Sequence, residues 1–182
     1  MRIKARMGLS IDGFVATPDG IPSLVRAPDF VPGRSHGYPE FIEGSDAVVM
    51  GRQTFVPALG APDWPWGDMK VFVLTSSPLP PETPAEVVVS QGGPEGLVDQ
   101  LRSRGSDGDV HLVGGPRTIQ AISEIGALDS LEVIVLPFIL GSGVRLWPAG
   151  TPAPATSLLR EPRVFADGSV ELAYGITRVP SG

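Results

Sequence analysis

Short apolar runs rich in β-branched residues alternate along the chain with helix-type patterns, and this alternation limits the possible folds more than any other feature. Runs that are apolar throughout are typical of strands in a parallel or mixed sheet that is covered on both faces. The runs that predict such strands are residues 46–51, 70–75, 86–89, 110–114 and 131–140. Residues 2–9 instead alternate apolar and polar side chains, which predicts a half-exposed strand.

Helix-type patterns lie between these strands. Residues 94–105 and 116–126 each start with a proline and end with a glycine, which is the usual punctuation of a helix. Residues 38–44 and 52–59 are shorter helix candidates, and Pro57 limits the length of the second.

The last part of the chain changes character. Residues 156–179 predict an antiparallel hairpin around the turn at residues 166–169. Alternating strands and helices followed by a hairpin predict an α/β sandwich with a mixed, mostly parallel sheet. The length of 182 residues predicts one domain over residues 1–179, with a loose tail at residues 180–182.

Charge and composition narrow the class of partner. A net charge of −6 argues against nucleic acid or an anionic membrane as the main partner. The chain has no cysteine, which excludes disulfides and thiolate metal ligands, and its two histidines lie far apart, so no metal site is expected. The start of the chain is too charged for a secretory signal, and no apolar run reaches membrane-spanning length. A cytoplasmic protein with a small-molecule substrate is therefore expected.

One strand-to-helix junction has the composition of an anion site. The apolar run 110–114 ends in Gly114 and Gly115, and Pro116 opens the next helix. Glycine lets a ligand approach the backbone closely, and the first N–H groups of a helix favour an anion. Arg117 and Thr118 add a cation and a hydroxyl group. Such a junction also occurs where a strand and a helix pack tightly, and this alternative stays open.

Two further strand ends repeat this chemistry. Open α/β sheets bind ligands at the carboxyl ends of their strands, so the three strand ends predict one extended site for a polyphosphate. No dinucleotide-binding or P-loop glycine motif is present. Cationic and hydroxyl groups beside a ribose favour the 2′-phosphate form, NADP. The additional residues are Gly51, Arg52 and Thr54 after the first of these strands, and Thr75, Ser76 and Ser77 after the second.

Five segments carry a resemblance to a known family. In order they read MGLSIDGFVATPDG, DAVVMGRQTF, VFVLTSS, VHLVGGPRT and LPFILGSGVRLW. This order resembles the dihydrofolate reductase-like fold, and in particular the C-terminal reductase domain of the riboflavin-biosynthesis protein RibD. The resemblance implies a three-layer sandwich, NADPH as the cofactor, and a homodimer formed through the terminal strands.

The resemblance also implies roles for individual cofactor-binding residues. Arg52 and Thr54 would hold the adenosine phosphates and the pyrophosphate, and Ser76 would meet the 2′-phosphate. Residues 114–118 would wrap the pyrophosphate. Residues 11–16, including Ala16, would lie along the nicotinamide, and backbone groups near Gly8 and Val15 would fix its carboxamide.

Two carboxyl groups are candidates for catalysis. Asp12 lies in a turn, S-x-D-G, that riboflavin-type reductases share, although an Asp-Gly pair after a strand is also a common turn. Asp29 resembles the proton-donating carboxyl group of dihydrofolate reductases, but the tryptophan of their loop is absent, and a helix N-cap or an exposed loop residue are the alternatives. Phe41, Leu136 and Pro137 would border the substrate, with core packing as the alternative for Phe41.

The sequence thus predicts an NADPH-dependent reductase of a small heterocyclic substrate, similar to 5-amino-6-(5-phosphoribosylamino)uracil reductase or to dihydrofolate reductase. The zinc deaminase half of bifunctional RibD is excluded because its ligands include cysteine. A non-catalytic NADP-binding or interaction protein on the same fold is the alternative, because fold does not determine function.

Overall fold

The structure is a computed structural model that describes residues 1–61, 64–90, 92–150 and 153–177. The chain divides into two compact units, one of Met1–Ala5 with Gly44–Asp129 and one of Arg6–Glu43 with Ser130–Gly182. Strand β1 (Ile3–Ser10) begins in the first unit and ends in the second. The single domain predicted from the sequence stays a prediction, and the predicted tail at 180–182 lies outside the described residues.

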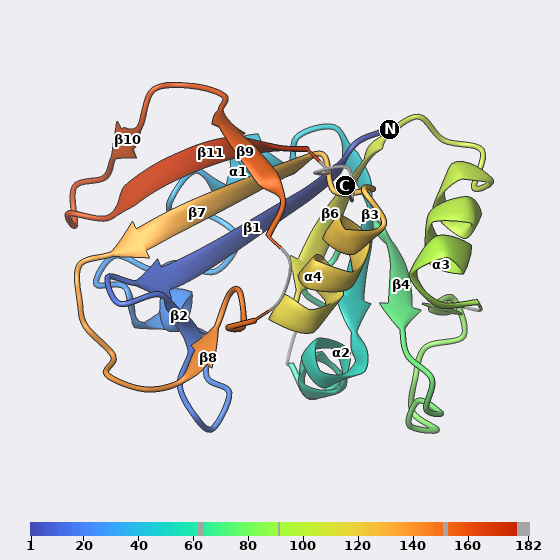
Figure 1. The fold of residues 1–182 in the computed structure, drawn as a ribbon. Coiled ribbons are helices and arrows are strands. Elements are labelled where there is room, and N and C mark those ends of the chain that lie inside the picture. The colour runs from blue at the N-terminus through green and yellow to red at the C-terminus, as the bar shows by residue number, and fades with distance from the viewer. Residues whose placement is uncertain (62–63, 91, 151–152, 178–182) are drawn as a thin grey trace. The chain divides into compact units, whose positions relative to one another are not determined.

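The first unit contains a parallel sheet. Strand β3 (Ser45–Gly51) lies between β6 (Asp109–Gly114) and β4 (Lys70–Leu74), and all three point the same way (Figure 1). The start of β1 pairs with β6, and β5 (Val88–Val89) pairs with β4, both in parallel. The buried strands predicted at residues 46–51, 70–75 and 110–114 are therefore confirmed.

Three helices of this unit follow the predicted patterns. They are α2 (Arg52–Ala58), α3 (Gly93–Arg102) and α4 (Pro116–Glu124). Helix α3 buries Leu97, Val98 and Leu101, and α4 buries Ile119 and Ile122, so each amphipathic pattern turns its apolar face inward. No helix among the described residues has the length and apolar character needed to span a bilayer.

Two sequence predictions about burial are wrong. Strand β5 has two residues where a buried strand over 86–89 was predicted, and Val89 is 36% exposed, because within the described residues β5 pairs on one side alone. Strand β1 is buried and not half-exposed. Its polar residues are buried because they meet opposite charges: Lys4 Nζ lies 3.3 Å from Asp109 Oδ2.

The second unit is mainly antiparallel. Strand β7 (Ser130–Leu136) pairs with β11 (Val170–Thr177), whose other edge pairs with β9 (Ala155–Leu158) and β10 (Arg163–Val164). The predicted C-terminal hairpin is confirmed as far as Thr177, with its first strand divided into β9 and β10. Residues 178–179 of that prediction lie outside the described residues.

Shorter elements complete the second unit. Strand β7 ends at Leu136 and not at residue 140, because Pro137 cannot donate to a sheet. Strands β2 (Phe14–Ala16) and β8 (Val144–Arg145) form a small antiparallel sheet that the sequence did not predict. Two short helices lie between β2 and Glu43, where the first chain segment of this unit ends. They are the single-turn helix η1 (Ser23–Arg26) and helix α1 (Tyr38–Ile42).

A buried cluster of charges holds the second unit together. The Arg6 guanidinium lies 2.8 Å from Glu132 Oε2 and 3.0 Å from Glu171 Oε2, and it also donates to the backbone carbonyls of His36 and Gly37. Burial lowers the pKa of Arg6 below its usual value, while the two carboxylates oppose that change. Arg160 closes the cluster at 2.7 Å from each glutamate.

Substitution of Arg6 by methionine should destabilise the protein strongly. The change leaves two buried carboxylates without their main partner, so we expect the free energy of unfolding to fall by about 3–5 kcal/mol. Urea unfolding followed by circular dichroism measures it. Arg102→Met is the matched control, because Arg102 forms an exposed ion pair with Asp99, and it should change stability by no more than about 0.5 kcal/mol. Equal effects of the two variants would contradict a structural role for the buried cluster.

Candidate functional site

Three parallel strands of the first unit end side by side. In the sheet register Met50 of β3 is opposite Gly114 of β6, and Gly51 is opposite Leu74 of β4. The segments after these strands therefore leave the sheet at one edge, with Arg52, Thr75 and Gly115 as their first residues. The structure thus brings together the three strand ends for which the sequence predicted a common site.

The two glycine junctions fit into each other. A Cβ atom at Gly51 would lie 2.7 Å from Thr118 Oγ1, and a Cβ atom at Gly115 would lie 3.6 Å from Thr54 Oγ1. Each threonine thus lies against the glycine of the other junction. Thr118 is buried there, and its backbone N–H donates to the carbonyl of Gly115 over 2.9 Å. The absence of a side chain at Gly51 is therefore a packing requirement, and its predicted contact with a cofactor stays a prediction.

Most of the remaining polar groups of this edge are exposed, while Thr54 and Thr75 are half-buried. Arg52 Nε donates to the Pro78 carbonyl over 3.2 Å, which holds the arginine beside the segment that follows β4. Thr75 Oγ1 accepts the N–H of Ser77 over 3.0 Å, so Thr75 shapes the turn while Ser76 is exposed. Arg117 is exposed in the first turn of α4. Two guanidinium groups, hydroxyl groups and a helix start are a donor set suited to phosphate oxygens.

Three predicted cofactor residues lie in the second unit. Gly8 is buried in β1, and a Cβ atom there would lie 2.6 Å from Leu24 Cβ, so the packing of η1 requires glycine. Val15 is buried in β2, and Ala16 pairs with Val144 of β8. Their predicted contacts with a nicotinamide stay predictions.

The two candidate catalytic carboxyl groups differ in their surroundings. Asp12 accepts the backbone N–H groups of Leu140 and Gly141 over 3.0 and 2.8 Å. A hydrogen bond from Ser10 and these backbone bonds hold the pKa of Asp12 at about 2, so Asp12 is ionised at neutral pH. Asp29 is exposed in a turn after Ala27, and because helix α1 begins only at Tyr38, the N-cap interpretation of Asp29 is wrong. Their predicted catalytic roles stay predictions.

The three residues predicted to border the substrate have different surroundings. Phe41 is buried in α1, and the Arg6 guanidinium lies 5.3 Å from its ring centre. Leu136 is buried against Ala27. Pro137 is exposed. The side chains of Phe41 and Leu136 thus serve the core, and Pro137 is the one of the three that is open to a ligand.

Sequence reasoning missed the buried polar pairs of the second unit. His36 Nε2 lies 2.9 Å from Asp167 Oδ2, and both side chains are buried. Burial alone would raise the pKa of Asp167, but hydrogen bonds from His36 and Ser169 hold it below its usual value. The available signal was the charge of Arg6, Glu132 and Glu171 in the interior of predicted strands, which requires a partner of opposite charge when the strand is buried.

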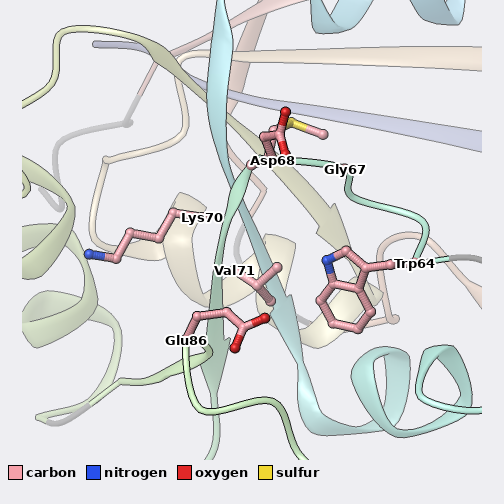
Figure 2. A pocket seen from close by; sticks show the side chains of 7 residues that line it. Trp64, Gly67, Asp68, Lys70, Val71 and Glu86 are labelled. Atoms are coloured by element: carbon pink, nitrogen blue, oxygen red, sulfur yellow. The ribbon is translucent and has the colours of Figure 1, made fainter.

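A pocket of about 370 Å³ in the first unit lies away from these residues (Figure 2). It borders the start of β4, whereas Thr75 to Ser77 follow the other end of that strand. Trp64 packs edge-on against Phe55 of α2, with ring centres 6.4 Å apart, and Figure 2 shows Lys70 extending away from Trp64. None of the predicted site residues lines the pocket, whose lining is Trp64, Gly67, Asp68, Met69, Lys70, Val71 and Glu86.

The chain belongs to the RibD C-terminal domain family, whose family model matches residues 64–169. This membership confirms the resemblance that the order of the sequence motifs indicated, and it supports a reductase-like function. A curated relative is the uncharacterised protein YwjB of Bacillus subtilis strain 168, which is 27% identical over 143 residues, 78% of this chain and 79% of YwjB.

Solved structures confirm the fold. A Shewanella sp. PV-4 protein, provisionally named for riboflavin biosynthesis, is 23% identical with a TM-score of 0.81, covering 98% of this chain and 100% of that one. A Thermotoga maritima diaminohydroxyphosphoribosylaminopyrimidine deaminase/5-amino-6-(5-phosphoribosylamino)uracil reductase is 16% identical with a TM-score of 0.69. The match covers 96% of this chain and 56% of that protein. The predicted α/β, dihydrofolate reductase-like fold with a mixed, mostly parallel sheet is thereby confirmed.

Substitution of Gly51 by alanine should disturb the strand edge. The new methyl group would meet the buried Thr118 hydroxyl, so we expect a loss of about 1–3 kcal/mol in stability. Gly60→Ala is the control, since a Cβ atom there has ordinary contacts. Adding Thr118→Ala to Gly51→Ala removes the clashing oxygen and should restore part of the loss. Thermal unfolding of the two single glycine variants, Thr118→Ala alone, the double variant and wild type measures this. No recovery in the double variant would contradict the described interlock.

Proposed function

We propose that this protein is an NADPH-dependent reductase of a small heterocyclic substrate. The observation that carries the proposal is the meeting of three strand ends in the first unit, with glycine, arginine and hydroxyl residues at the same edge. Membership of the RibD C-terminal domain family supports it. The name of the Thermotoga maritima relative includes a uracil reductase activity, so phosphoribosylaminopyrimidines are the first substrates to test, with dihydrofolate as the second.

The first-unit residues fit a dinucleotide phosphate by their chemistry. Arg52 and Arg117 offer guanidinium donors to phosphate oxygens, and Ser76 offers an exposed hydroxyl group to the 2′-phosphate. The start of α4 adds backbone donors and the positive end of a helix dipole. When bound, the reduced nicotinamide supplies the hydride, and the protein supplies binding and orientation.

The second unit supplies the proposed substrate-side residues. Pro137 is exposed at the end of β7, and Asp29 is exposed in its turn. Reduction of a C=N bond also needs a proton. Because the Asp12 carboxylate is occupied by the backbone N–H groups of Leu140 and Gly141, whereas Asp29 is exposed, Asp29 is the better proposed source of the proton.

The proposal is tested by binding and then by turnover. Calorimetric titration with NADPH and NADH measures cofactor binding. Addition of the pyrimidine substrate or dihydrofolate to the NADPH complex, followed by the absorbance of reduced nicotinamide, measures oxidation. Binding with oxidation supports the reductase. Binding without oxidation of either substrate favours the alternative, a non-catalytic NADP-binding protein, and no binding of either nucleotide overturns the cofactor assignment.

Substitution of Arg52 by alanine should weaken NADPH binding. Loss of a charge-assisted phosphate contact should raise the dissociation constant about 10- to 100-fold, and the increase should be larger for NADPH than for NADH. Arg102→Ala removes an exposed arginine of the same unit that lies on α3, and it should leave both affinities unchanged. An equal loss for the two nucleotides would count against a contact with the 2′-phosphate.

We also propose a cytoplasmic homodimer, in which the exposed arm of β9 and β10 forms the contact between subunits. This arm carries apolar side chains that nothing covers among the described residues, and Val164 is 71% exposed. Light scattering should therefore give the mass of two chains. Val164→Glu should shift the protein to a monomer, and a wild-type mass of one chain at micromolar concentration would reject the dimer.

A further inference from the structure

Two segments of the second unit are joined at several points. The first is the β1–β2 turn with β2, residues 10–16, and the second is the loop that follows β7 together with β8, residues 137–145. The Ile11 N–H donates to the Phe138 carbonyl over 2.9 Å. At the other end Phe14 pairs with Arg145, and the Arg145 guanidinium lies 4.6 Å from the Phe14 ring centre.

Asp12 makes a further contact between the two segments, at a position between Ile11 and Phe14. Its Oδ1 accepts the Leu140 N–H and its Oδ2 accepts the Gly141 N–H, so one carboxylate receives two consecutive backbone donors. Hydrogen bonds to an ionised acceptor are about twice as strong as those between neutral groups. A proton on either oxygen would remove an acceptor site, so the geometry selects the ionised form.

The loop also approaches β2 more closely than a side chain would allow. Gly143 has a φ of +151°, and a Cβ atom there would lie 2.1 Å from the Ala16 carbonyl oxygen. This close approach requires glycine. The two segments are thus fixed at Ile11, Asp12, Phe14 and Ala16 in succession, and among these contacts Asp12 contributes a carboxylate that accepts two hydrogen bonds.

We propose that Asp12 is a positioning residue that fastens the loop of residues 137–145 to the β1–β2 turn and is not the proton donor of the reaction. The fastened loop presents Pro137 and Ile139 in one arrangement, and Ile139 is 73% exposed while Ile11 on the facing segment is 61% exposed. These side chains contact the substrate. That last step rests on the proposed function, whereas the fastening of the loop does not.

Amide hydrogen exchange tests the fastening without any ligand. In Asp12→Ala the Leu140 and Gly141 amides should exchange about 10-fold faster or more than in wild type, because both lose their acceptor. Asp12→Asn keeps one carbonyl oxygen, so at least one of the two amides should exchange faster. Asp19→Asn is the matched control, an exposed carboxyl group in the next turn bonded to Thr17, and it should leave both amides unchanged. Unchanged exchange in the Asp12 variants would overturn the proposal.

Wild-type protein provides a test that needs no variant. The amide proton shifts of Leu140 and Gly141 should stay constant from pH 7 down to about pH 4, where an ordinary aspartate is already about half protonated. Constant shifts support a carboxylate held by these amides. A titration step of both amides above that pH would overturn it.

Kinetics separates positioning from proton transfer once turnover is found. Asp12→Asn should raise the KM for the substrate about 10-fold and keep the limb of the kcat profile that falls as pH rises, because that limb reports deprotonation of the proton donor and the donor is unchanged. Loss of that limb with an unchanged KM would identify Asp12 as the donor and overturn the proposal. If NADPH does not bind, the proposed function fails, but the exchange experiment still decides whether Asp12 holds the loop.

Discussion

The parallel pairing of β3 with β4 and β6 is the constraint on which the proposed cofactor site depends. The pairs Met50 with Gly114 and Gly51 with Leu74 set where the three segments leave the sheet. A shift of one residue would reverse the face of each side chain, and Thr118 would no longer meet the glycine at position 51. The register therefore decides both the packing at this edge and which polar groups are presented to a ligand.

The second unit depends on a different kind of interaction. Its strands are linked by Arg6, Glu132 and Glu171, and the same guanidinium holds the backbone at His36 and Gly37. Buried charges of this kind are costly when a partner is missing, so they favour a single arrangement of the strands over its alternatives. The His36–Asp167 pair adds a second link between the segment before α1 and the turn of the C-terminal hairpin.

Local signals account for what the sequence predicted well. The proline before Arg117 and the glycines at positions 51 and 115 mark strand-to-helix junctions. Such junctions depend on residues that are neighbours in the sequence, and the sequence predicted them correctly. The length and burial of β5 were not predicted correctly, because the burial of an edge strand depends on what lies beside it. The partners of Asp12 were also missed, since Leu140 and Gly141 are 128 and 129 residues away and offer backbone groups that every residue carries.

Arg6 and Glu171 are separated by 165 residues, and this separation has a consequence for how the chain is made. Residues 6–43 leave the ribosome well before the strands that complete their unit, which come from residue 130 onward. At about 5–20 residues per second, the early segment waits on the order of ten seconds for its partners. During translation its apolar side chains are uncovered, so this part of the nascent polypeptide offers a surface to which chaperones can bind.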